Sequence, residues 1–129
     1  INIYNTKQEV AINFSSYFSN LIEDKKTLHI ALSGGSTPKI VFNELVDNFS
    51  DKINWSGVHL YWGDERCVAP TDNESNYKMT VDFLISKINI PEENIHRIKG
   101  EDNPVKEAIR YSEVLKKIVP QENNLPKFD

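Results

Sequence analysis

Short apolar runs alternate along this chain with segments in which apolar residues recur at helical spacing. Two runs, residues 28–32 and 58–62, are almost continuously apolar, and shorter strands are expected at 1–4 and 94–98. Runs of this length without polar alternation are typical of strands buried on both faces of a parallel sheet. Strands that alternate with helices predict an α/β fold, namely a Rossmann-like parallel sheet with helices on both faces.

Four segments carry the apolar stripe of an amphipathic helix. The first should begin at a capping box formed by Thr6 and Glu9. Thr37 is expected to cap the second, with Pro38 in its first position, and Asn103 to cap the fourth. The expected stripes are Val10, Phe14, Tyr17, Phe18 and Leu21; Phe42, Leu45, Val46 and Phe49; Val81, Leu84, Ile85 and Ile88; and Ala108, Tyr111, Leu115 and Ile118.

A glycine-rich turn joins the run at 28–32 to the second helix. Its sequence is Ser33-Gly34-Gly35-Ser36-Thr37-Pro38. Glycines let the backbone turn sharply and approach a ligand closely. A helix start with free N–H groups and two hydroxyls beside it is suited to a phosphate group.

A charged cluster, Asp64-Glu65-Arg66, directly follows the run at 58–62. The arginine could bind a phosphate or carboxylate through two hydrogen bonds. The carboxylates could orient that arginine or act in acid–base chemistry, and the alternative interpretation is a solvated turn with weak ion pairs. If the two long strands are neighbours, this cluster and the glycine turn border one crevice, because ligands bind at the carboxyl ends of parallel strands.

Composition narrows the class of protein. The chain has 129 residues and a net charge of −4, and no basic face of the kind that non-specific nucleic-acid binding requires. No segment is long and apolar enough for a membrane span. The single cysteine, Cys67, excludes an internal disulfide and indicates a reducing, cytoplasmic location. The three histidines have no metal-ligand spacing, so no metal site is expected.

The polar segment 121–129 follows the last helix where a parallel sheet would require another strand. Phe128 could be the first residue of that strand, and a disordered natural terminus is the other interpretation. We therefore expect residues 1–129 to form a single α/β domain with an incomplete sheet. On this hypothesis the chain is the amino-terminal half of a longer sugar-phosphate-processing domain.

Three segments in this order carry a family resemblance. They are Leu32–Pro38, the segment Tyr61-Trp62-Gly63-Asp64-Glu65-Arg66-Cys67-Val68, and Asp72-Asn73-Glu74-Ser75-Asn76-Tyr77. Together they resemble the amino-terminal portion of the glucosamine-6-phosphate isomerase/6-phosphogluconolactonase family. The deaminase branch typically has tyrosine where Arg66 stands, so the lactonase branch is favoured. The resemblance implies hydrolysis of 6-phospho-D-glucono-1,5-lactone to 6-phosphogluconate in the pentose phosphate pathway, with no metal or organic cofactor.

The resemblance also implies roles for particular residues. Gly34, Gly35, Ser36 and Thr37 match the loop near the substrate phosphate, and Arg66 matches a substrate-contacting arginine. Asp64 and Glu65 match the acidic pair of that motif and have supporting roles. Asn76 matches a recurrent position and is expected to order the loop. The family's general-base histidine lies in a Gly-x-Gly-x-Asp-Gly-His segment that this sequence lacks. The catalytic base is therefore expected beyond Asp129, and would activate water for attack on the lactone carbonyl.

Two other functions remain open at this point. The first is a glucosamine-6-phosphate isomerase/deaminase, in which Asp64 would abstract a proton from the sugar. The second is a non-enzymatic sugar-phosphate-sensing domain, whose continuation would lack the histidine segment. Under all three interpretations the ligand is a small sugar phosphate, and the oligomeric state stays open.

Overall fold

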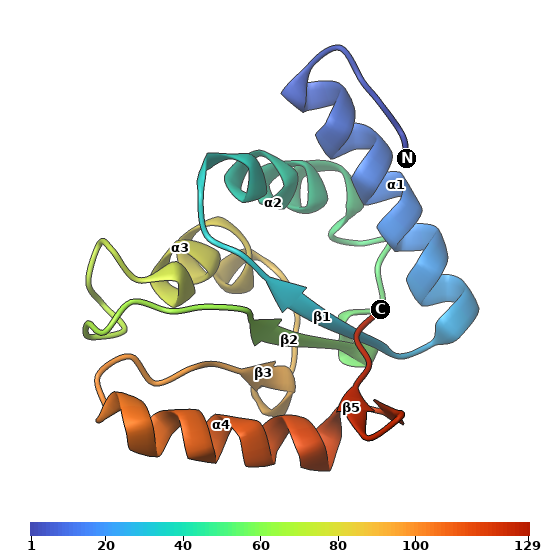
Figure 1. The fold of residues 1–129 in the computed structure, drawn as a ribbon. Helices are drawn as coiled ribbons and strands as arrows, with labels where there is room; N and C mark the ends of the chain where they lie inside the picture. The colour runs from blue at the N-terminus through green and yellow to red at the C-terminus, as the bar shows by residue number, and fades with distance from the viewer.

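The computed structural model describes residues 1–129 and has the expected α/β architecture (Figure 1). Its helices are α1 (Lys7–Lys25), α2 (Ser36–Phe49), α3 (Asn76–Phe83) and α4 (Pro104–Ile118). Its strands are β1 (Leu28–Leu32), β2 (Val58–Trp62), β3 (Ile95–His96), β4 (Gln121–Glu122) and β5 (Leu125–Pro126). The alternation of apolar runs and helical stripes therefore predicted the order of the main elements correctly.

The three strands β1, β2 and β3 form a parallel sheet in that order. In the register between the first two, Leu32 lies opposite Trp62, and the Gly63 N–H donates to the Leu32 carbonyl over 2.9 Å. The strands that precede the glycine turn and the charged cluster are thus neighbours that end together. This pairing confirms the arrangement on which the expected crevice depends.

One face of the sheet carries the hydrophobic core. Helices α1 and α2 lie on this face and pack against each other (Figure 1). Alternate strand residues point into this core, since side chains in a strand project to opposite faces in turn. The buried cluster comprises Phe18, Ile22, Leu28, Phe42, Leu45, Ile53, Trp55, Val58, Leu60, Trp62 and Leu84.

The other face carries a row of aromatic side chains from all three strands. His29 stacks on His59, His59 stacks on His96, and the His59 Nδ1 lies 3.2 Å from the His96 Nε2. Tyr61 is fully buried among them, and its hydroxyl lies 3.0 Å from the His29 Nδ1. Helix α4 joins this side of the molecule through Tyr111, whose hydroxyl bonds to the backbone at the end of β2. Helices therefore lie on both sides of the sheet, as expected.

The amino-terminal expectations need correction. Residues 1–4 form no strand and are exposed. Thr6 does cap α1, but the Glu9 side chain accepts from the Asn5 N–H instead of completing a capping box with Thr6. The buried stripe of α1 is also rotated from the expected one, since Phe14 and Tyr17 are 43% and 60% exposed. Phe18 is buried as expected, and Ala11, Ser15 and Ile22 are buried with it.

Later boundaries differ too. Helix α3 ends at Phe83, and Ile85 begins a separate 3-10 turn, Ile85–Lys87. Leu84 and Ile88, the other two residues of the expected stripe beyond α3, flank this turn. The strand expected at 94–98 contains only two residues. The carboxyl-terminal segment forms the hairpin of β4 and β5, with Asn123 and Asn124 at φ 53° and 63°. Asparagine tolerates the left-handed conformation that such a two-residue turn requires, so Asn-Asn was an available signal.

The last two residues lie beside the outer edge of β1. The Asp129 N–H donates to the His29 carbonyl over 3.0 Å, and the His29 N–H donates to the Asp129 carboxylate over 2.9 Å. Phe128 packs edge-on against Tyr61. The end of the chain therefore runs alongside the outer edge of β1.

None of the helices combines the length and the apolar character that crossing a bilayer would require.

The histidine row makes folding stability sensitive to acid. Burial lowers the pKa of His29, His59 and His96, and for His96 burial and the neighbouring histidines lower it to about 4. Below pH 6.5 the histidines of the unfolded chain bind protons that the folded protein does not bind. The free energy of unfolding should therefore be at its full value above pH 6.5 and should fall as the pH is lowered towards 4. We expect a loss of about 1–2 kcal/mol in the free energy of unfolding between pH 7 and pH 5. Urea unfolding at both pH values measures it. The His96→Gln variant should show a flatter dependence, and an unchanged pH slope in this variant would contradict the prediction.

Candidate functional site

The glycine turn and the loop after β2 meet through one side chain. A Cβ added to Gly34 would lie 2.0 Å from the Asn76 Oδ1, so the Gly34 backbone packs directly on this amide. The Asn76 Nδ2 in turn donates to the Asp64 carbonyl over 3.2 Å. Asn76 is buried at the first position of α3. It therefore holds the two loops together, which agrees with the ordering role that the sequence suggested for it.

The glycine turn leaves the start of α2 open. Gly35 is the N-cap residue with φ 113°, a conformation that favours glycine, and the helix begins at Ser36. The expectation that Thr37 caps the helix is therefore wrong, because the turn completes earlier. The N–H groups of Ser36 and Thr37 have no acceptor within the chain, and both residues are exposed. Free N–H groups at the positive end of a helix attract an anion.

Glu65 is fully engaged within the protein. Its carboxylate accepts from the N–H groups of Asn76 and Tyr77 at 2.8 and 2.9 Å, and from the Ser75 hydroxyl at 3.1 Å. It also accepts from the Arg66 N–H at 2.7 Å. A carboxylate at a helix N-terminus is well placed to satisfy unpaired donors there. Glu65 thus joins the charged cluster to α3, and it has no contact with the Arg66 guanidinium.

Asp64 and Arg66 are the free members of the charged cluster. Both are exposed, and neither side chain has a hydrogen bond or ion pair within the chain. The backbone of Arg66 is nevertheless held, since its N–H bonds to Glu65 and its carbonyl accepts from the Val68 N–H at 2.8 Å. The cluster therefore presents one free carboxylate and one free guanidinium from a fixed backbone.

Two cavities border these loops. A groove of about 260 Å³ lies between α1, α2 and the outer edge of β1, and the glycine turn forms one end of it. Twelve of its fifteen lining residues are hydrophobic, including the exposed Phe14. A second cavity of about 420 Å³ separates the charged cluster from α4. Asp64, Cys67 and Lys99 are among its polar lining residues.

The histidines do not belong to this site. All three lie within β1, β2 and β3, where they stack on one another or on Tyr61, and none lies in the two loops. No group of three or more histidine, cysteine or carboxylate side chains is arranged to hold a metal ion. The arrangement can bind and orient an anion through the α2 amides and Arg66, while Asp64 can accept a proton or a hydrogen bond.

Sequence reasoning missed two parts of this site. Ser75 caps α3 and bonds to Glu65, and its position before Asn76-Tyr77 was a signal of a helix start. Gly100 packs against the Arg66 carbonyl, and a Cβ there would lie 2.1 Å from that oxygen. No local sequence pattern predicts the role of Gly100, because its contact partner, Arg66, lies more than thirty residues earlier in the chain.

Comparisons with known proteins agree with the motifs. Residues 4–129 match a family described as glucosamine-6-phosphate isomerases/6-phosphogluconolactonase. A protein from Haemophilus influenzae named 6-phosphogluconolactonase is 48% identical over 94 residues, which are 72% of this chain and 40% of that protein. One of the same name from Treponema pallidum is 33% identical over 128 residues, 99% of this chain and 53% of that protein.

A solved structure described as the devB protein superposes with a TM-score of 0.95. It is 43% identical, and the match covers 99% of this chain and 54% of that one. The chain therefore spans about half the length of the relatives that it matches from end to end.

The two carboxylates of the cluster should differ sharply in their contribution to stability. Glu65→Ala removes the acceptor of four donors, and we expect the free energy of unfolding to fall by about 2–4 kcal/mol. Asp64→Ala, the matched control, removes an exposed side chain without partners and should change it by less than about 0.5 kcal/mol. Urea unfolding measures both. Equal losses in the two variants would show that the α3 contacts of Glu65 are unimportant.

Proposed function

Because this chain belongs to the glucosamine-6-phosphate isomerase/6-phosphogluconolactonase family, we propose that it is part of an enzyme that hydrolyses 6-phospho-D-glucono-1,5-lactone to 6-phosphogluconate. One observation carries the proposal. Two loops that follow the carboxyl ends of neighbouring strands both present free groups that can bind an anion. These groups are the amides of Ser36 and Thr37 and the guanidinium of Arg66. They suit a substrate with one phosphate and one polar ring.

The phosphate is proposed to bind at the start of α2. Two unpaired N–H groups and the hydroxyls of Ser36 and Thr37 offer donors there, and at Gly35 no atom beyond its chain neighbours lies within 4 Å of where a side chain would begin. Arg66 can add a pair of parallel hydrogen bonds to an anionic or carbonyl oxygen, because its guanidinium is planar and always charged. Together these groups would fix the ring relative to the end of β2.

The chemical step needs few groups from the protein. A lactone is already an activated ester, so water can attack its carbonyl without a covalent enzyme intermediate. A general base would take a proton from that water, and hydrogen-bond donors would stabilise the tetrahedral oxyanion. Collapse of this intermediate would break the bond between the carbonyl carbon and the ring oxygen, and the protonated base would return its proton to that oxygen, which leaves as a hydroxyl group of the open-chain acid. The two loops contain no imidazole, so we propose that the base lies outside residues 1–129. Asp64 is the free carboxylate of the charged cluster, and its proposed role is to support binding.

Coverage of the relatives supports a proposal about domain organisation. Nearly all of this chain aligns with about half of each relative that it matches end to end. We therefore propose that residues 1–129 form the amino-terminal half of one longer sugar-phosphate-processing domain in the cytoplasm. The apolar groove beside β1 is then a surface available for packing within that domain.

Arg66→Ala in the full-length protein tests the site. Losing a charged donor pair should lower kcat/KM for the lactone by about 10- to 100-fold, chiefly through KM. Arg66→Lys should recover only part of this, because an ammonium does not make the paired hydrogen bonds. The exposed Lys117→Ala removes the same charge outside the site and serves as the control.

Two results would count against the proposal. An unchanged kcat/KM in Arg66→Ala would remove this residue from the mechanism. Release of ammonia from glucosamine 6-phosphate by the parent protein, without lactone hydrolysis, would instead identify the deaminase reaction.

A further inference from the structure

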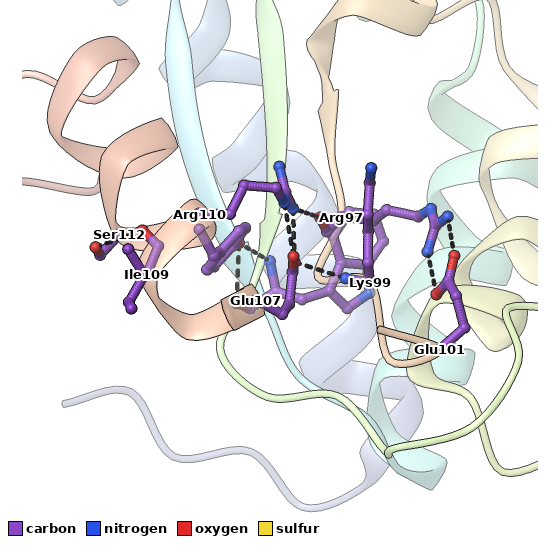
Figure 2. A network of polar contacts seen from close by, with 9 residues as sticks. Arg97, Lys99, Glu101, Glu107, Ile109, Arg110 and Ser112 are labelled. Atoms are coloured by element: carbon purple, nitrogen blue, oxygen red, sulfur yellow. Dashed lines mark hydrogen bonds and ion pairs between the residues drawn. The ribbon is translucent and has the colours of Figure 1, made fainter. Parts of the chain in front are cut away.

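The loop that follows β3 is tied to α4 by a compact polar network (Figure 2). The Glu107 carboxylate accepts from the Lys99 N–H over 2.8 Å. Arg110 makes two bonds of 2.6 Å to the same carboxylate, and its Nη2 also donates to the Arg97 carbonyl over 3.1 Å. The loop is therefore attached to one helix at two backbone positions.

Glu107 is unusually buried for a glutamate. It is 4% exposed, whereas Glu113 on the same helix is exposed and pairs only with Lys116. The hydrogen bond from Arg110 holds the pKa of Glu107 below its ordinary range, so the carboxylate stays charged near neutral pH. A buried carboxylate is rarely kept in proteins unless its partners hold it in one geometry. This one fixes the position of the loop at residues 97–100.

The same loop packs closely against the backbone of Arg66. A Cβ at Gly100 would lie 2.1 Å from the Arg66 carbonyl oxygen and 2.9 Å from that of Val68. The approach is backbone against backbone, so no flexible side chain can give way. On its other side Arg66 is held through its N–H by Glu65. The exposed guanidinium thus extends from a backbone fixed at both its N–H and its carbonyl.

We propose that Gly100 and the Glu107–Arg110 pair are positioning residues for Arg66, and that they set the placement of its guanidinium in the sugar-phosphate site. This inference rests on the function proposed above. Neither Gly100 nor Glu107 has a hydrogen bond to the start of α2, and both lie at the cavity beside Asp64, on the side of the charged cluster that faces α4. Their proposed influence on the substrate passes through the backbone of Arg66, which Gly100 contacts. A misplacement of about 1 Å in a group that orients a substrate can cost up to about 100-fold in rate.

A mutant cycle in the full-length protein tests the inference. Gly100→Ala should lower kcat/KM for the lactone about tenfold, chiefly through KM, as Arg66→Ala does. In the Arg66→Ala variant, Gly100→Ala should lower kcat/KM by less than about twofold. The effects of two substitutions are not additive when both act through one group. Glu107→Ala should behave like Gly100→Ala, and Glu107→Gln should be milder because it keeps an acceptor for the Lys99 N–H.

Two control variants separate positioning from loss of stability. A Cβ at Gly57 would lie 2.2 Å from the Lys26 carbonyl, at the opposite end of β2 from Arg66. Gly57→Ala therefore introduces a similar clash far from the site and should leave the KM of the folded protein unchanged. Glu113→Gln removes an exposed charge from α4 and should leave both kinetic constants unchanged.

The outcomes distinguish this inference from the proposed function. Suppose that Arg66→Ala impairs hydrolysis but Gly100→Ala lowers kcat/KM by the same factor in the parent protein and in the Arg66→Ala variant. The positioning role is then overturned, and the proposed function stands. The same holds if Gly100→Ala has no greater effect on KM than Gly57→Ala. If Arg66→Ala changes nothing, both the proposed role of Arg66 and its positioning by Gly100 and Glu107 are overturned.

Discussion

The parallel pairing of β1 with β2 is the constraint on which the rest of this structure depends. Since Leu32 and Trp62 lie opposite each other, the two strands end at the same level. The glycine turn and the charged cluster therefore leave the sheet side by side, although nearly thirty residues separate them in the chain. Asn76 then bridges them by packing against Gly34 and bonding to the Asp64 carbonyl. A shift in this register would separate the anion-binding groups of the two loops.

Charged residues near the site divide into those that hold the protein together and those left free. Glu65 and Glu107 are carboxylates that accept several hydrogen bonds each, and both fix loop backbone to a helix. Such groups stabilise a structure only when all their donors are present, because an unpaired buried charge is costly. Asp64 and Arg66 stay exposed and without partners. The paired groups thus set the backbone from which the free ones reach a ligand.

The outer edge of β1 combines two unusual properties. Its apolar groove lies beside the exposed Phe14 of α1, and the chain end at Asp129 bonds to the backbone of His29. Apart from this contact with Asp129, the outer edge of β1 is paired with no other strand, and an unpaired strand edge is able to pair with another strand. The face of the sheet opposite the core carries the histidine row, and burial lowers the pKa of all three histidines. Core packing and acid sensitivity are therefore located on different faces of one sheet.

Local sequence alone determined the order of the elements, the parallel sheet and the two loops of the site. Apolar runs, caps and glycines report on backbone conformation within a few residues, which is why β1, β2 and the turn at Gly34 could be predicted. The roles within the site were decided by tertiary structure. Glu65 and Arg66 are adjacent and both charged, yet only the position of α3 engages one and leaves the other free. Likewise, the proposed roles of Gly100 and Glu107 depend on folding, which places the loop held by α4 against the Arg66 backbone. Contacts between distant segments leave no pattern in local sequence.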